Sequence, residues 1–351
     1  GTSWLAKLSS GDVVWNTSET ANIGDDPCTM AFGCARLAIN DVSSRGLQPI
    51  ANSNQSVWVA LNGEIYNFVE LRRTLAAMGY SFRSGTDTEV IAHAYTAWGN
   101  KCFDHFNGQF AIAIADMAHQ TLTLARDRIG ITPLFLRRTP HAISFASELR
   151  GILAGPGAPP DINPERLAAT IGLPYKLHQR QAATLYKDVI HVLPGERITI
   201  DMGLTVKRQF YWQADQVTTP IPSNLHDACE HLQTLYIDAV RRRLRTDRRF
   251  AFIVSGGIDS PSVIGISQKL FGADVKTFSL DLPDERFNEN DSIRQVIMFN
   301  NVKSHFISVT ADIVAKTIPR VFARTDEPLA TPNALLHPIL ADAIGAEGFR
   351  V

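Results

Sequence analysis

The chain has 351 residues, 45% of them apolar and 20% charged, which is typical of a globular protein long enough for two domains. Its 34 lysines and arginines almost balance 35 aspartates and glutamates, so charge gives no general attraction to nucleic acid or to an anionic membrane. The apolar runs are much shorter than the roughly 20 residues of a membrane span, and the four cysteines form neither a CxxC pair nor a zinc-ligand spacing. We therefore expect a cytoplasmic protein with reduced thiols that binds no nucleic acid and no membrane.

Residues 30–150 contain short apolar strands separated by turns and helical stretches, which predicts an α+β domain with much antiparallel strand. Between these strands, NFVELRRTLAAMG (67–79) has apolar residues at helical spacing and a terminal Gly79, so it predicts an amphipathic helix. The expected strands are VWVALNGEIY, QFAIAIADM, TLTLARD, LFLRR and AISFAS.

Residues 151–222 are richer in proline and glycine, and they contain a predicted hairpin of ERITI and VKRQFYW around the turn DMGL. We expect a linker at 213–223. After it, a helix at 224–244 precedes the strands FAFIV, VKTFSL and SHFISV, which alternate with further helices. This alternation predicts a parallel sheet. The basic run RRRLRTDRR (241–249) could bind nucleic acid, but the cationic end of the preceding helix is the simpler interpretation.

The segment SGGIDS (255–260) follows FAFIV, at the place where ligands of parallel sheets gather. Its two glycines let backbone amides approach an anion, and its two serines add hydroxyl groups. Asp259 beside a phosphate would be repelled unless a divalent cation lay between them, so we interpret it as a Mg²⁺ ligand. The alternative is a plain turn with a helix cap, for which Pro261 is also suited.

SGGIDS resembles the pyrophosphate loop of enzymes that cleave ATP between its α- and β-phosphates, and it lacks the Gly-Lys-Ser/Thr ending of a Walker loop. Seven motifs precede it, in this order: RLAIND, QPI, LNGEIYN, SGTDTEV, NGQFAIAIAD, ARDRIGITPLF and FASELRGIL. With these motifs, the sequence resembles the glutamine-dependent asparagine synthetases over almost the whole chain.

The resemblance implies two folds. Residues 1–212 would form a class II glutamine amidotransferase domain, an Ntn-hydrolase-type αββα sandwich. Residues 224–351 would form an ATP-pyrophosphatase synthetase domain, an adenine-nucleotide α-hydrolase-like parallel sheet. A homodimer is possible.

The resemblance also assigns roles in glutamine hydrolysis. Arg36 would pair with the α-carboxylate of glutamine, and Asp87 would hold its ammonium group. The Asn62 side chain and the Gly63 amide would form the oxyanion hole, with Glu64 helping to fix the substrate. Taken singly, Asn-Gly also suits a hairpin turn, and lone Arg or Asp residues are usually solvated. The implied glutamine site comprises Arg36, Leu37, Ile39, Asn62, Gly63, Glu64 and Asp87.

For the nucleotide, the resemblance implies ATP and Mg²⁺ as cofactors, with Asp259 as the metal ligand and main-chain groups of Val254 and Leu280 beside adenine. TDEPLATPNAL (325–335) would lie near the acceptor. The implied ATP site comprises Val254, Ser255, Gly256, Gly257, Asp259, Ser260, Ser279 and Leu280.

The chain departs from the family at its amino end. The family uses an N-terminal cysteine as nucleophile, whereas this chain opens GTSWLAKL and has no cysteine before Cys28. We expect that the true amino end and the carboxyl part of the synthetase domain are missing. A glutaminase that has lost activity, as in β-lactam synthetases, and Thr2 as a substitute nucleophile are the alternatives.

The expected activity is adenylation of a carboxylate, aspartate by default, and its amidation with ammonia from glutamine, which releases AMP, pyrophosphate and glutamate. One alternative is a family member of secondary metabolism that amidates or cyclises another acid, or an ammonia-only ligase. Another is a nucleotide-binding module without catalysis.

Overall fold

The computed structural model describes residues 2–8, 13–16, 28–155, 157–172, 182–217, 220–329 and 331–351, with side chains from residue 29 onward. The chain divides into two compact units, Gly1–Thr218 and Thr219–Val351. The assignment of a separate activity to each unit stays a prediction. The side chain of Thr2 lies outside the described residues.

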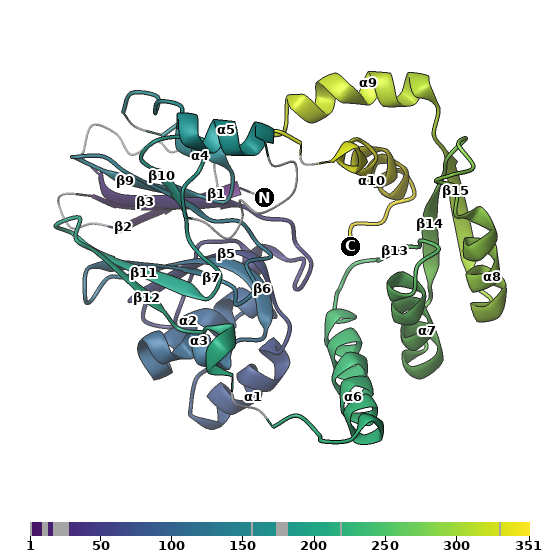
Figure 1. The fold of residues 1–351 in the computed structure, drawn as a ribbon. Helices are drawn as coiled ribbons and strands as arrows, with labels where there is room; N and C mark the ends of the chain where they lie inside the picture. Colours follow the sequence, from purple (N-terminus) through teal and green to yellow (C-terminus); the bar gives the residue numbers. More distant parts are fainter. Residues whose placement is uncertain are drawn as a thin grey trace. The chain divides into compact units, whose positions relative to one another are not determined.

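In the first unit, two layers of antiparallel sheet lie between helices (Figure 1). One layer is a six-stranded sheet in the order β12-β11-β7-β6-β5-β4, and the other holds the sheets β10-β8-β9 and β2-β1-β3. The strands of the large sheet are β4 (Ile50–Ala51), β5 (Val57–Ile65), β6 (Gly108–Asp116), β7 (Thr121–Arg126), β11 (Glu196–Asp201) and β12 (Val206–Phe210). Those of the second layer are β1 (Thr2–Leu8), β2 (Val13–Asn16), β3 (Cys28–Ala35), β8 (Phe135–Arg138), β9 (Ile143–Ala146) and β10 (Val189–His191).

Strand β6 explains how both faces of the large sheet are filled. Because successive side chains of a strand point to opposite faces, Ile112 and Ile114 pack in the core beneath the helices, while Ala111 and Ala113 pack in the core between the two sheet layers. The alanines leave room for the second layer, from which Leu134 and other apolar residues reach the same core. The αββα sandwich expected from the sequence is confirmed.

Among the described residues, helices cover the open face of the large sheet, and others lie beyond the second layer (Figure 1). The predicted amphipathic helix is confirmed as α1, whose Leu71 and Leu75 are buried. It ends just before Met78, which is 50% exposed, and Gly79, which has a φ of 96°. The helices are α1 (Phe68–Ala77), α2 (Asp87–Trp98), α3 (Cys102–His105), α4 (Leu149–Leu153) and α5 (Pro164–Gly172).

In the second unit, three parallel strands in the order β13-β14-β15 confirm the predicted parallel sheet. A core that includes Ile264 and Ile293 lies beneath α7 and α8, and α10 packs through Leu340 against Phe278 of β14. The strands are β13 (Phe252–Ile253), β14 (Lys276–Asp281) and β15 (Lys303–Ser308). The helices are α6 (Leu225–Arg243), α7 (Asp259–Phe271), α8 (Asn290–Asn300), α9 (Ala311–Phe322) and α10 (His337–Ala346).

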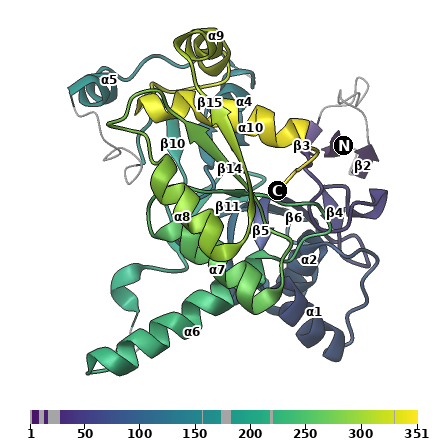
Figure 2. The same cartoon turned by 90° about the vertical axis from the view of Figure 1, so that its right-hand side faces the viewer.

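Two details of this unit differ from or extend the sequence analysis. Strand β13 is shorter than the predicted FAFIV at both ends. The Ala251 amide donates to the Val351 carbonyl (2.9 Å), and the chain turns into the loop after Val254, whose amide donates to the Phe278 carbonyl (3.0 Å). Figure 2 shows α6 beside α7, where the hydroxyls of Tyr236 and Ser262 lie 2.7 Å apart.

The basic run begins in the last turn of α6, where Arg241 and Arg242 both pair with Asp238. These contacts favour the helix-end interpretation of that run. Among the helices in the described parts of the chain, none combines the length and the apolar character that crossing a membrane requires.

Candidate functional site

The first unit contains a cavity of about 710 Å³ that gathers the residues expected to bind glutamine. They come from three places in the chain: the segment after β3, the end of β5 and the start of α2. The cavity is lined by Arg36, Leu37, Ile39, Asn62, Gly63, Glu64 and Asp87, all seven of the predicted residues. Their individual roles stay predictions.

Two carboxyl groups lie on the wall formed by β5 and α2. Asp87 is the first residue of α2, after the N-cap Thr86, and its Oδ2 accepts a hydrogen bond from the Ile65 amide (2.9 Å). Burial raises the pKa of Asp87. Burial, together with the nearby charge of Asp87, raises the pKa of Glu64 to about 8. A cation entering the cavity would favour the ionised form of both groups, which suits the ammonium group of an amino acid.

Arg36 provides the positive charge of the same cavity. Its guanidinium donates to the carbonyl oxygens of Asn40 and Asp41, both at 2.7 Å, so the loop after it holds it in one orientation. Gly46 permits this placement, because a Cβ there would lie only 2.7 Å from Arg36 Cζ. Burial lowers the pKa of Arg36. A guanidinium and two carboxyls that line the same cavity match an α-amino acid head group.

Asn62 and Gly63 lie within β5, paired with Ala111 and Phe110 of β6, so the alternative that they form a hairpin turn is wrong. The φ of Gly63 is 131°, and a side chain there would overlap the carbonyl of Gln109 on β6. Only glycine fits this position, because both the backbone conformation and the space exclude a Cβ. The Asn62 side chain is exposed, at the edge of the cavity.

The cavity also has lining residues to which the sequence analysis assigned no role. Asn40 is buried, and its Nδ2 donates to Glu64 Oε2 (2.8 Å). Gln48 accepts a hydrogen bond from the Leu61 amide (2.7 Å), which ties it to β5. The motifs RLAIND and QPI contain these two residues, but nothing in their spacing indicated the contacts. Other unassigned lining residues include Cys34, Ser147, Glu148 and Arg150.

Cys34 is the cysteine that lines this cavity, and its surroundings do not favour a nucleophile. Its Sγ lies 3.9 Å from the Leu61 carbonyl, and burial raises the pKa of the thiol. Because the thiolate is the reactive form, this position would be poorly reactive at neutral pH.

In the second unit, the loop SGGIDS binds a carboxylate of its own chain. The Gly256 amide donates to Glu289 Oε2 (2.9 Å), and the Ser255 amide donates to Ser260 Oγ (2.9 Å). A Cβ on Gly256 would lie 3.0 Å from Glu289 Cβ, so the glycine also permits close packing of the residue before α8. The loop therefore offers an amide donor to an anion, and the Glu289 carboxyl group already accepts a hydrogen bond from it.

The other residues of the implied ATP site lie around this loop. Asp259 is the first residue of α7 and is exposed, and a carboxylate so placed suits Mg²⁺. Ser279 is completely buried, and its hydroxyl donates to the Val254 carbonyl (3.2 Å), so it supports the strand end. Leu280 packs with the core around Phe278.

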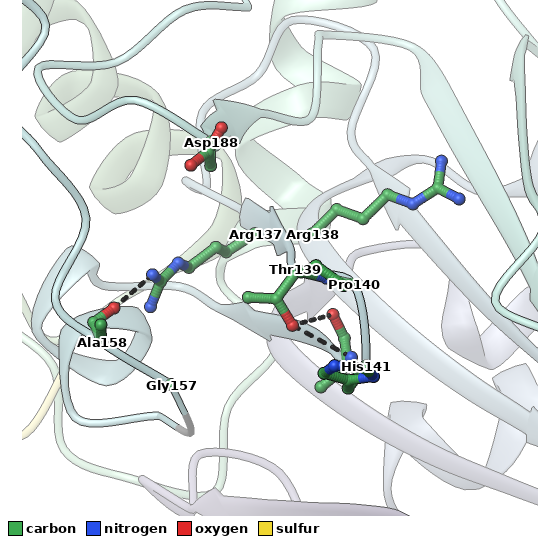
Figure 3. Close-up of a pocket in the computed structure, with 9 residues that line it drawn as sticks. Arg137, Arg138, Thr139, Pro140, His141, Gly157, Ala158 and Asp188 are labelled. Atoms are coloured by element: carbon green, nitrogen blue, oxygen red, sulfur yellow. Dashed lines mark hydrogen bonds between the residues drawn. The ribbon is translucent and has the colours of Figure 1, made fainter.

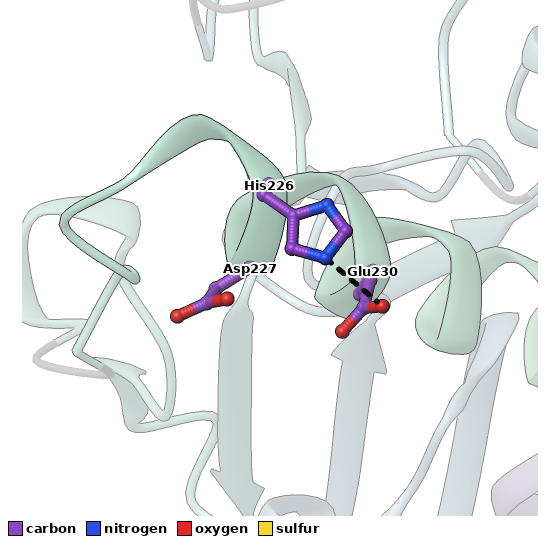
Figure 4. Close-up of side chains that lie close together, drawn as sticks. All are labelled: His226, Asp227 and Glu230. Carbon is purple, nitrogen blue, oxygen red and sulfur yellow. Dashed lines mark ion pairs between the residues drawn. The ribbon is translucent and has the colours of Figure 1, made fainter.

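Among the described residues, two further surface features contain none of the residues predicted for the glutamine site or the ATP site. A depression of about 760 Å³ lies over β8 and the turn after it, where buried Arg137 donates to the Ala158 carbonyl (Figure 3). At the start of α6, the exposed His226, Asp227 and Glu230 gather, with His226 Nε2 lying 3.4 Å from Glu230 Oε1 (Figure 4). The second cluster is a solvated helix start, because the same contacts suit an ordinary first turn.

Comparison with known proteins found a family model that matches most of the first unit and another that matches most of the second. The family model for a glutamine amidotransferase domain matches residues 19–212, and the model for asparagine synthase matches residues 231–351. Asparagine synthetase [glutamine-hydrolyzing] 3 of Bacillus subtilis is 32% identical over 275 residues, which are 76% of this chain and 43% of the relative. Amidase chyE of Penicillium rubens is 26% identical over 362 residues, which are 97% of this chain and 52% of the relative.

The chain spans about half of the length of these two relatives, or less. Among solved structures, a glutamine phosphoribosylpyrophosphate amidotransferase from B. subtilis aligns with 88% of this chain and 85% of its own, at 14% identity and a TM-score of 0.46.

Proposed function

Because this chain belongs to the family that joins a glutamine amidotransferase domain to an asparagine synthase domain, we propose that it acts in the glutamine- and ATP-dependent amidation of a carboxylic acid. The first unit releases ammonia from glutamine, and the second adenylates the acid. Ammonia then displaces AMP from the acyl-adenylate. The observation that supports this most directly is the cavity that holds all seven residues expected at glutamine.

In the first unit, the wall of the cavity orients glutamine. Arg36 pairs with its α-carboxylate, and Asp87 and Glu64 accept hydrogen bonds from its ammonium group. The carboxamide then lies by Asn62 and the Gly63 amide, which stabilise the oxyanion that forms on attack at the carbonyl carbon. The attacking nucleophile is not among the residues that we assign.

In the second unit, the SGGIDS loop and the start of α7 bind the phosphates of ATP. The amides of the loop donate to phosphate oxygens, and Asp259 holds Mg²⁺. Magnesium, when bound, would offset the negative charge of the leaving diphosphate. The contact of Gly256 with Glu289 supports this assignment, because it shows that the loop amide binds an anionic oxygen.

The acceptor is aspartate by default, and the fungal relative favours a second candidate. Amidase chyE matches 97% of this chain, which is consistent with a family member of secondary metabolism that amidates a different acid. The residues at 325–335 would contribute to that choice.

One experiment tests both half-reactions. The protein is incubated with ATP, Mg²⁺, a panel of carboxylic acids, and either glutamine or ammonium, and AMP, pyrophosphate and glutamate are measured. Asp87→Asn should abolish glutamate release and glutamine-dependent amidation but leave ammonium-dependent AMP release. Asp259→Ala should reduce AMP release with either nitrogen source by about 100-fold or more, because the metal ligand is lost.

Asp188→Asn, at an exposed residue outside both sites, is the control and should change neither reaction. Equal AMP release by wild type and Asp259→Ala would contradict the synthetase assignment. Equal glutamate release by wild type and Asp87→Asn would contradict the glutamine assignment.

A further inference from the structure

Asn40 links the two charged sides of the glutamine cavity. It lies in the loop after Arg36 and is 7% exposed. Its side-chain Nδ2 donates to Glu64 Oε2 (2.8 Å), and its main-chain carbonyl accepts from Arg36 Nη2 (2.7 Å). One residue therefore touches both a carboxylate and the guanidinium expected to hold the substrate's head group.

We propose that Asn40 is a positioning residue of this site, which orients Glu64 and Arg36 to receive the ammonium and carboxylate groups of an α-amino acid. The inference rests on the proposed binding of glutamine. It concerns a residue that the motif comparison did not assign, because the role depends on a contact between positions 24 residues apart.

The electrostatics of the cavity explain why this amide matters. Burial and the charge of Asp87 disfavour the ionised form of Glu64, whereas the Asn40 hydrogen bond and the charge of Arg36 favour it. A substrate ammonium group needs an ionised carboxylate, so the Asn40 donor extends the pH range over which Glu64 can bind it. The titratable and charged groups that line this cavity are Cys34, Arg36, Glu64, Asp87, Glu148 and Arg150.

A replacement at Asn40 should therefore act through pH as well as through affinity. Glutamine binding by the wild type should tighten as pH rises through the pKa of Glu64, about 8. In Asn40→Leu, which keeps the number and branching of the side-chain heavy atoms but removes the donor, the midpoint of this dependence should move to higher pH. At about pH 7 the variant should bind glutamine about tenfold more weakly, and the difference should shrink at alkaline pH.

The measurement is isothermal titration of glutamine into the chain across this pH range, with circular dichroism as the check on folding. Asn67→Leu is the control, because the Asn67 side chain also forms hydrogen bonds, in its case to the backbone of His105 and Asn107, but does not line the cavity. Asn40→Asp, which keeps the side-chain size, covers the case in which Asn40→Leu does not fold, and it should shift the midpoint in the same direction.

An unchanged midpoint in the Asn40 variants, or a loss of affinity equal at every pH, would overturn the inference while leaving the glutamine site in place. Absence of glutamine binding by the wild type at every pH would instead overturn the proposed function, and the inference with it.

Discussion

Replacement of Glu64 by glutamine should stabilise the first unit at alkaline pH. The pKa of this carboxyl rises from 4.5 to about 8 in the folded chain, because burial and Asp87 disfavour its charge. At about 1.4 kcal/mol for each pH unit, full ionisation in the folded state costs on the order of 5 kcal/mol. The contribution of Glu64 to the free energy of unfolding is therefore most favourable below pH 4.5, falls as pH rises, and stops falling above about 8.

Glu64→Gln stays neutral at every pH and can still accept the hydrogen bond from Asn40. Its free energy of unfolding should match the wild type near about pH 4.5 and exceed it by about 3 to 5 kcal/mol near about pH 9.5. Urea denaturation followed by tryptophan fluorescence measures this, and all five tryptophans precede residue 219, so the signal reports on the first unit. Glu165→Gln, at an exposed residue of α5, is the control. A Glu64→Gln variant no more stable than the wild type at alkaline pH would refute the reasoning.

Two further replacements test a glycine of the glutamine cavity and a carboxylate beside the SGGIDS loop. Gly63→Ala should lower the free energy of unfolding by on the order of 3 kcal/mol in urea denaturation, since a Cβ overlaps the facing carbonyl. Gly79→Ala, also at a positive φ but with open space around it, should lower the free energy of unfolding by only about 1 kcal/mol. An equal decrease in the two variants would contradict the steric argument. Glu289→Gln should bind ATP with Mg²⁺ about three- to tenfold more tightly by calorimetry, because a charge that competes for the Gly256 amide is removed. Glu285→Gln, exposed in the same loop, should bind as the wild type does, and weaker binding by Glu289→Gln would show that its carboxylate assists the nucleotide.

The sequence by itself determined the local elements and the type of fold. The apolar run QFAIAIADM predicted a strand, which the structure has as β6, and its isoleucines and alanines pack on opposite faces there because side chains of a strand alternate. Helical spacing with Leu71 and Leu75 predicted α1, and strand–helix alternation after residue 224 predicted the parallel sheet. The order of the motifs pointed to the family, and with it to the residues expected at glutamine.

Only the tertiary structure decided which side chains meet. The pairing of β5 with β6 places Gly63 where a Cβ cannot fit, and neither strand alone contains that information. The contact of Asn40 with Glu64 joins residues 24 apart, and that of Gly256 with Glu289 joins residues 33 apart. Local sequence patterns record the period of a helix or strand, whereas such contacts depend on strand register and on how distant segments pack. For the same reason the raised pKa of Glu64 could not be read from LNGE, since burial and the approach of Asp87 produce it.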